Sequence, residues 1–204
     1  MERIENWETI EAKGMDDFKA LPIGAYECVI KDARVNENPE THKRTFKVSV
    51  DIAKGEYQDY FLKRYTNNTN TDKKWDNNAV RYLAFEGDNV AYFKGFITSV
   101  ENSNPGYKWN WDETTLKGKK ICGVFQYEEY EKQDGSRAVK IRLNKFRSMD
   151  KMKEASENLS DNVKLLNGKY MSIDDYNERQ DENKQLNDLF GDSVVEISSS
   201  DLPF

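Results

Sequence analysis

Basic and aromatic side chains stand close together in two stretches of this chain. Residues 63–65 combine two cations with a ring, and residues 137–147 hold five cations in eleven positions. Cations of this kind follow a phosphate backbone, and flat rings offer a surface on which bases stack. The pattern is typical of a groove that holds single-stranded nucleic acid. The candidate contact residues of these stretches are Lys63, Arg64, Tyr65, Lys140, Arg142 and Phe146.

Four further rings fit the same chemistry. Trp109 and Trp111 lie with Tyr107 and Lys108 in a loop that follows a Pro-Gly pair. Trp75 stands beside a basic pair, and Tyr127 lies near a predicted hairpin. Stacking on an exposed ring contributes about 1–3 kcal/mol per base. Packing over the end of a hydrophobic core is the alternative role for each ring, and the sequence is compatible with both.

The sequence gives little support for a catalytic site. The single histidine, His42, has no second histidine or suitably placed cysteine with which to complete a metal site. Neither a GxxxxGK[ST] loop nor a GxGxxG motif occurs. The acidic pairs at 16–17 and 174–175 fall in predicted surface segments. We therefore expect a protein that is not an enzyme and that needs no metal or cofactor.

Hydrophobic periodicity indicates the elements that position these residues. The clearest strand is 46–52, in which Phe46, Val48, Val50 and Ile52 share one face. Asp88 is a candidate N-cap for a helix whose apolar positions between 90 and 100 follow helical spacing. The other predicted strands are 25–31, 57–65, 119–130 and 137–147, and the other predicted helices are 75–85 and 149–157.

This order, three strands, a helical insertion and a two-stranded hairpin, is that of the OB-fold, a five-stranded Greek-key barrel. Such barrels bind oligonucleotides on strands 2–3 and on the loops that join strands 1–2 and 4–5. Strict alternation along the last strand would place Lys140, Arg142, Asn144 and Phe146 on its outer face. We expect a mainly β (α+β) domain at 21–150, after an arm at 1–20 and before a short helix and a flexible acidic tail at 151–204.

Charge separates the predicted tail from the body. Residues 1–150 carry equal numbers of basic and acidic side chains, so the net charge of −6 comes entirely from residues 151–204. An acidic tail on a neutral body indicates an interaction tail. Cys28 and Cys122 lie in predicted strands and are expected to be buried and reduced. Residues 1–5 lack the features of a signal peptide, and no apolar run is long enough for a membrane span, so we expect a soluble cytosolic protein.

The chain ends on an apolar pair. Its last four residues are Asp201, Leu202, Pro203 and Phe204, and they close a polar, acidic segment. This ending resembles the C-terminal tip of single-stranded-DNA-binding proteins, where Pro-Phe after acidic residues recruits replication and repair partners. Here serines 198–200 stand where that family usually has acids.

Several motifs in the body resemble a second family. Residues 21–26 read Leu-Pro-Ile-Gly-Ala-Tyr, residues 50–57 Val-Asp-Ile-Ala-Lys-Gly-Glu-Tyr, and residues 93–97 Phe-Lys-Gly-Phe-Ile. Residues 103–113 end in Asn-Trp-Asp-Glu, the most distinctive part, and residues 116–119 read Leu-Lys-Gly-Lys. They are similar to small proteins from the replication modules of phages of Gram-positive bacteria, long known only as a domain of unknown function. The resemblance covers residues 20–147 and implies a replication role in the host cytoplasm, without supplying binding residues.

Two functions follow as hypotheses. The first is sequence-independent binding of single-stranded DNA in phage replication or recombination. In this hypothesis the tip recruits a helicase, primase, polymerase or recombinase. The alternative is an adaptor of a replication complex that binds no DNA, and the neutral body favours it because most nucleic-acid binders carry a basic excess. The oligomeric state stays open.

Overall fold

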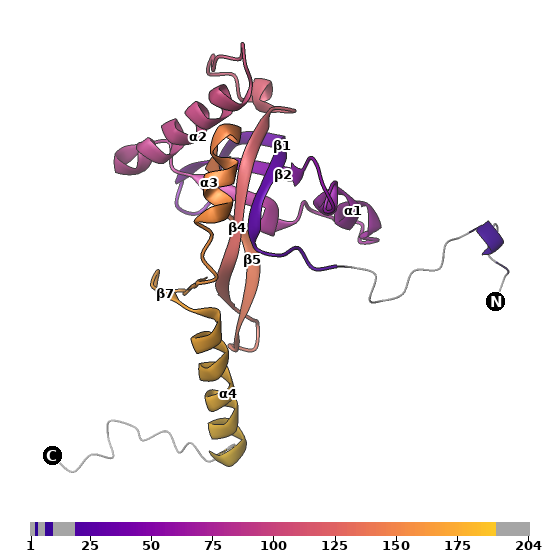
Figure 1. Cartoon of the computed structure of the whole chain (residues 1–204), viewed down its shortest axis with the longest axis vertical. Helices are drawn as coiled ribbons and strands as arrows, with labels where there is room; N and C mark the ends of the chain where they lie inside the picture. Colours follow the sequence, from indigo (N-terminus) through magenta and orange to yellow (C-terminus); the bar gives the residue numbers. More distant parts are fainter. Residues whose placement is uncertain (1–2, 4–6, 10–18, 191–204) are drawn as a thin grey trace.

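The computed structural model describes residue 3 and residues 7–9 and 19–190, with side chains as far as residue 185. Within these residues it is a mixed α/β protein built on one seven-stranded sheet (Figure 1). The strands are β1 (Gly24–Glu37), β2 (Arg44–Ile52), β3 (Val80–Leu83), β4 (Lys120–Glu131), β5 (Arg137–Arg147), β6 (Val163–Lys164) and β7 (Tyr170–Met171). The helices are α1 (Tyr60–Asn67), α2 (Val90–Ser103), α3 (Met152–Glu157) and α4 (Ile173–Phe190), joined by short 3-10 turns.

The sheet is open. Its order is β3-β2-β1-β4-β6-β7, and β5 pairs with the other edge of β4. All pairs are antiparallel except the short β4–β6 contact. β5 packs near β3 and the 3-10 turn η3 (Asn77–Ala79), but no ladder joins it to β3 among the described strands. A closed five-stranded barrel is therefore not shown.

The core lies between the sheet and α2. The predicted alternation of β2 is confirmed, because Phe46, Val48, Val50 and Ile52 are all buried. The predicted helix near residues 90–100 is also confirmed as α2, although the 3-10 turn η4 (Gly87–Asn89) precedes it and Asp88 is not its cap. The helix buries Phe93, Phe96, Ile97 and Val100.

Two predicted elements between β2 and α2 were wrong. Residues 57–65 were expected to form a strand, but helix α1 begins at Tyr60. Only Phe61 of this helix is buried, and its first amides bind the carboxylate of Asp51 in β2. Residues 75–85 were expected to be helical, but they form η3 and then β3, which pairs with β2. In both cases a contact remote in sequence overrides the local pattern.

Strand β5 contains a bulge that reverses its faces. Val124 of β4 pairs with Lys145, whereas the next residue, Phe125, pairs with Leu143, so Asn144 is the extra residue. Past this point the side chains exchange sides, and Phe146 is 7% exposed and packs on Phe96. The expectation that Phe146 shares an outer face with Lys140 and Arg142 was wrong for this reason.

The chain after α3 is more ordered than expected. The predicted helix at 149–157 is confirmed as the turn η6 (Met149–Lys151) followed by α3. After Leu159, where we expected little order, β6, β7 and α4 follow. A second small core, formed by Val163, Leu165 and Tyr176, holds them against the β4–β5 hairpin. The predicted partner-binding tip, Asp201, Leu202, Pro203 and Phe204, lies outside the described residues.

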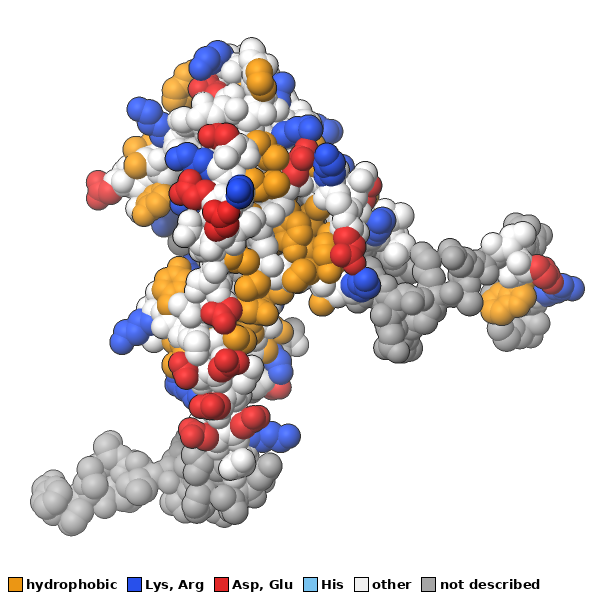
Figure 2. Space-filling model, viewed as in Figure 1, with side chains coloured by type: hydrophobic (Ala, Val, Ile, Leu, Met, Phe, Trp, Pro, Cys, Tyr) orange, Lys and Arg blue, Asp and Glu red, His pale blue; other side chains and the backbone are white. Residues whose placement is uncertain are grey.

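In the described part of the chain, none of the helices combines the length and the apolar character that a membrane span requires. Helix α4 is instead rich in charge, and Figure 2 shows acidic side chains along it.

Candidate nucleic-acid interface

The strand register aligns two cations and a ring across three strands. Arg34 of β1 pairs with Lys47 of β2, and Lys47 pairs with Tyr82 of β3. Residues that stand directly opposite each other in antiparallel strands have their side chains on the same face. Since the neighbours of Lys47, Phe46 and Val48, point into the core, this cationic row lies on the face away from it.

The cationic row of Arg34, Lys47 and Tyr82 is accessible. Tyr82 is 41% exposed, and the Arg34 side chain is 58% exposed. Arg34 forms an ion pair with Asp32 at 3.5 Å, but no carboxylate among the described residues lies within ion-pair distance of Lys47. None of Arg34, Lys47 and Tyr82 was predicted from the sequence as a contact residue. The pairing of these residues depends on strand register, and residues 75–85, which include Tyr82, had been expected to form a helix.

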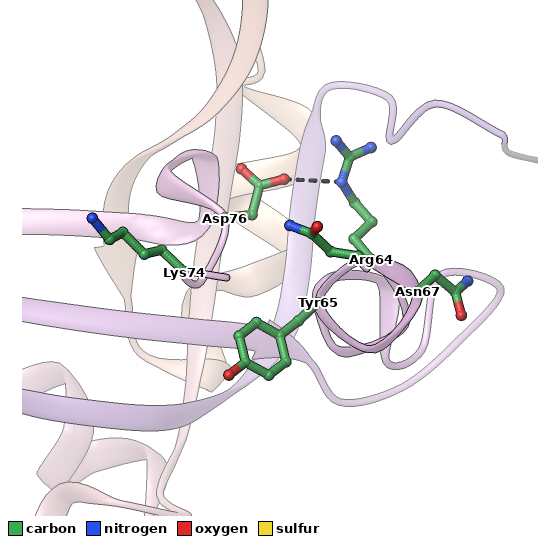
Figure 3. A pocket seen from close by; sticks show the side chains of 6 residues that line it. Arg64, Tyr65, Asn67, Lys74 and Asp76 are labelled. Carbon is green, nitrogen blue, oxygen red and sulfur yellow. Dashed lines mark ion pairs between the residues drawn. The ribbon is translucent and has the colours of Figure 1, made fainter. Parts of the chain in front are cut away.

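A hollow of about 530 Å³ lies beside α1 (Figure 3). Arg64, Tyr65 and Asn67 line it from the helix, and Lys74 and Asp76 line it from the segment before η3. The Nε atom of Arg64 forms an ion pair with a carboxylate oxygen of Asp76 at 2.9 Å. Arg64 and Tyr65 therefore line one hollow from a helix, whereas we had expected them on a strand.

Tyr65 and Trp75 form an aromatic pair near the C-terminal end of β2. Their ring centroids are 5.8 Å apart, and the ammonium of Lys73 lies 5.0 Å from the centre of the Tyr65 ring. The indole Nε1 of Trp75 donates to the carbonyl of Val50 at 3.1 Å. Trp75 is only partly buried, so it serves the core and leaves part of its ring accessible.

A second hollow, of about 280 Å³, shares Arg64 and Asp76 with the first. Its opposite wall comes from the β4–β5 hairpin and includes Tyr127 and Lys140. Figure 2 shows apolar side chains gathered in this region. The fold thus brings four predicted contact residues, from α1 and from the β4–β5 hairpin, to two adjoining hollows. These residues are Arg64, Tyr65, Tyr127 and Lys140.

The remaining predicted cations are placed less favourably. Arg142 lies on the same face of β5 as Lys140, but its guanidinium forms an ion pair with Glu128 at 3.3 Å. The ammonium of Lys140 lies 4.7 Å from the centre of the Tyr130 ring. Lys63 is exposed and donates to the carbonyl of Gln58 at 2.9 Å, and it does not line either hollow.

The two tryptophans of the loop between α2 and β4 have different environments. Trp109 packs edge-on against Phe46, with ring centroids 6.5 Å apart, and belongs to the margin of the core. Trp111 is 81% exposed, and its ring centroid is 6.3 Å from that of Trp109. Only Trp111 therefore offers a full ring face to a ligand.

No family model matches this chain, and no curated protein is significantly similar to it. Within the described residues, no three His, Cys, Asp or Glu side chains gather as metal ligands would. Cys28 and Cys122 are buried free thiols, and burial raises the pKa of the Cys122 thiol to about 11.

Proposed function

We propose that this protein binds single-stranded DNA without strong sequence preference. The observation that carries the proposal is the cationic row, in which Arg34, Lys47 and Tyr82 stand side by side on an open sheet face. Its residue types match the chemistry of single-strand binding, in which cations follow the phosphates and rings stack with bases. The hollows beside α1 offer further rings and cations.

The strand pattern supports an OB-like interpretation of the body. The order β3-β2-β1-β4-β5, with β5 packed near β3, is compatible with a partly open barrel. In such barrels the face of strands 2–3 binds oligonucleotides. The cationic row lies on β1, β2 and β3, which agrees with that mode.

A salt titration tests the proposal. The wild type is titrated into a fluorescent single-stranded oligonucleotide at several salt concentrations. We expect affinity to fall steeply as the salt concentration rises. Lys47→Ala should reduce the slope of log affinity against log salt concentration by about one, because one phosphate contact is lost. Tyr82→Ala should weaken binding by about 1–3 kcal/mol at every salt concentration, because it removes a stacking ring.

Matched controls come from the region after β5. Lys153, on α3, has an 88% exposed side chain, and Tyr170, on β7, is 59% exposed. Lys153→Ala and Tyr170→Ala should leave affinity and salt slope unchanged. If the wild type does not bind the oligonucleotide even at low salt, the proposal is refuted.

An adaptor that binds no DNA is the second candidate. Two of the proposed contact cations, Arg64 and Arg142, already pair with Asp76 and Glu128, which leaves little excess charge for phosphate.

In either case we propose that the C-terminal tip recruits a helicase, primase, polymerase or recombinase. Deletion of residues 198–204 should abolish capture of that partner and preserve or increase DNA affinity. Capture that survives the deletion would rule out this role of the tip.

A further inference from the structure

Trp111 combines high exposure with an unfavourable backbone conformation. Its side chain is 81% exposed, and its φ angle is +67°. Positive φ is rare for a residue with a side chain as large as tryptophan and persists only where the surroundings hold it. Folding alone gives no reason to place an indole here, since glycine would adopt this conformation without strain.

Side chains hold the loop on both sides of Trp111. On the N-terminal side, the Oε1 atom of Glu101 accepts the backbone N–H of Trp109 at 2.9 Å, and its Oε2 atom lies 3.4 Å from Lys108. On the C-terminal side, Asp112 accepts the backbone N–H of Thr114 at 3.0 Å. Glu101 belongs to α2, so a rigid helix fixes the loop that presents the indole.

A cationic hollow lies at the base of the same loop. It has a volume of about 540 Å³ and is lined by Tyr107, Lys119 and Lys120 among others. The Lys119 ammonium lies 4.5 Å from the centre of the Tyr107 ring, whereas Lys120 pairs with Glu27 at 2.8 Å. The Trp111 ring contacts that of Trp109, and Trp109 in turn packs on the buried ring of Phe46, so the core supports the loop.

We propose that Trp111 is a preorganised platform on which one base of single-stranded DNA stacks, and that Glu101 is the positioning residue that holds it. The adjacent phosphate lies near Lys119. A base fits better than a protein side chain because the loop that presents the ring also lines a cationic hollow, through Tyr107. This inference rests on the proposed function and assigns to it a specific stacking contact and the residue that controls that contact.

Three variants test the assignment: Trp111→Gly, Glu101→Ala and the double variant. Their affinities are measured for a single-stranded oligonucleotide and for an abasic strand of the same length. Trp111→Gly should weaken binding to the base-containing strand by about 5- to 150-fold, the equivalent of one lost stack, and leave abasic binding unchanged. Its stability should not fall, because glycine relieves the backbone strain.

Glu101→Ala removes the acceptor of the Trp109 N–H and separates positioning from general stability. It should weaken binding only to the base-containing strand, and it should have no further effect once Trp111 is absent. Equal losses on both strands, or additive losses in the double variant, would refute the role of Glu101. If Trp111→Gly binds DNA as tightly as the wild type does, the platform is refuted but the proposed function is not. If the wild type itself binds no DNA, the proposed function is refuted.

Discussion

The carboxylate of Asp51, in β2, accepts the backbone N–H of Phe61, in α1, at 3.0 Å. Its second oxygen accepts the N–H of Leu62 at 3.2 Å, and its first also binds the N–H of Ile52 at 2.9 Å. The residue at the helix N-cap, Asp59, has a φ of +58° and provides no side-chain cap. Asp51 therefore replaces the usual local cap, and it fixes α1, with Arg64 and Tyr65, against the sheet.

Asp51→Asn should destabilise the protein. Asparagine keeps one acceptor oxygen but presents an NH2 group to a backbone donor, and an unsatisfied buried donor costs about 1–3 kcal/mol. Urea unfolding measures this loss. Asp72→Asn is the control, because the Asp72 side chain is 88% exposed. Equal stability of the two variants would contradict the capping role of Asp51.

The bulge at Asn144 predicts opposite effects at neighbouring positions of β5. Phe146→Ala should cost about 3–5 kcal/mol, because it removes a buried ring from the core. Lys145→Ala, on the exposed side, should change stability by less than about 0.5 kcal/mol. Thermal or urea unfolding of both variants distinguishes this register from unbroken alternation, which would bury Lys145.

The loop that carries Trp111 should loosen in acid. The hydrogen bond from the Trp109 amide, followed by the charge of Lys108, lowers the pKa of Glu101 below its ordinary value of 4.5. Because the pKa is lower in the folded state, the stabilisation is complete above about pH 4.5 and is lost as the pH falls through the lowered pKa. Tryptophan fluorescence should change in this acid range, and in Glu101→Gln this transition should be absent.

Glu129 should control the docking of the chain after α3. It is 3% exposed, and its Oε2 atom accepts the backbone N–H of Leu166 at 3.0 Å. Glu129→Ala removes this acceptor and should weaken protection of the Leu166 amide by about 1–3 kcal/mol in hydrogen exchange. Amides of β2 should be unaffected, and the exposed Glu131, on the same strand, provides the control variant Glu131→Ala. An equal loss of protection in β2 would mean that the two parts unfold together.

Sequence alone determined the elements whose burial pattern is local. The alternation of β2, the helical spacing of α2 and the turn between β4 and β5 each follow from a few neighbouring residues, and the structure contains all three. The charge balance and the grouping of cations with rings also follow from composition. These features are the basis on which we predicted a nucleic-acid-binding surface that includes Arg64 and Tyr65.

Only the tertiary structure decided which of these residues meet. Asp51 caps helix α1, whose residues had the pattern of a strand, through a contact between residues ten positions apart. Pairing with β2 made a strand of Val80–Leu83 and brought Tyr82 beside Lys47. One extra residue at Asn144 buried Phe146, and the loop conformation exposed Trp111 while Trp109 packed on Phe46. Register, bulges and remote caps depend on partners far along the chain, so local patterns do not predict them.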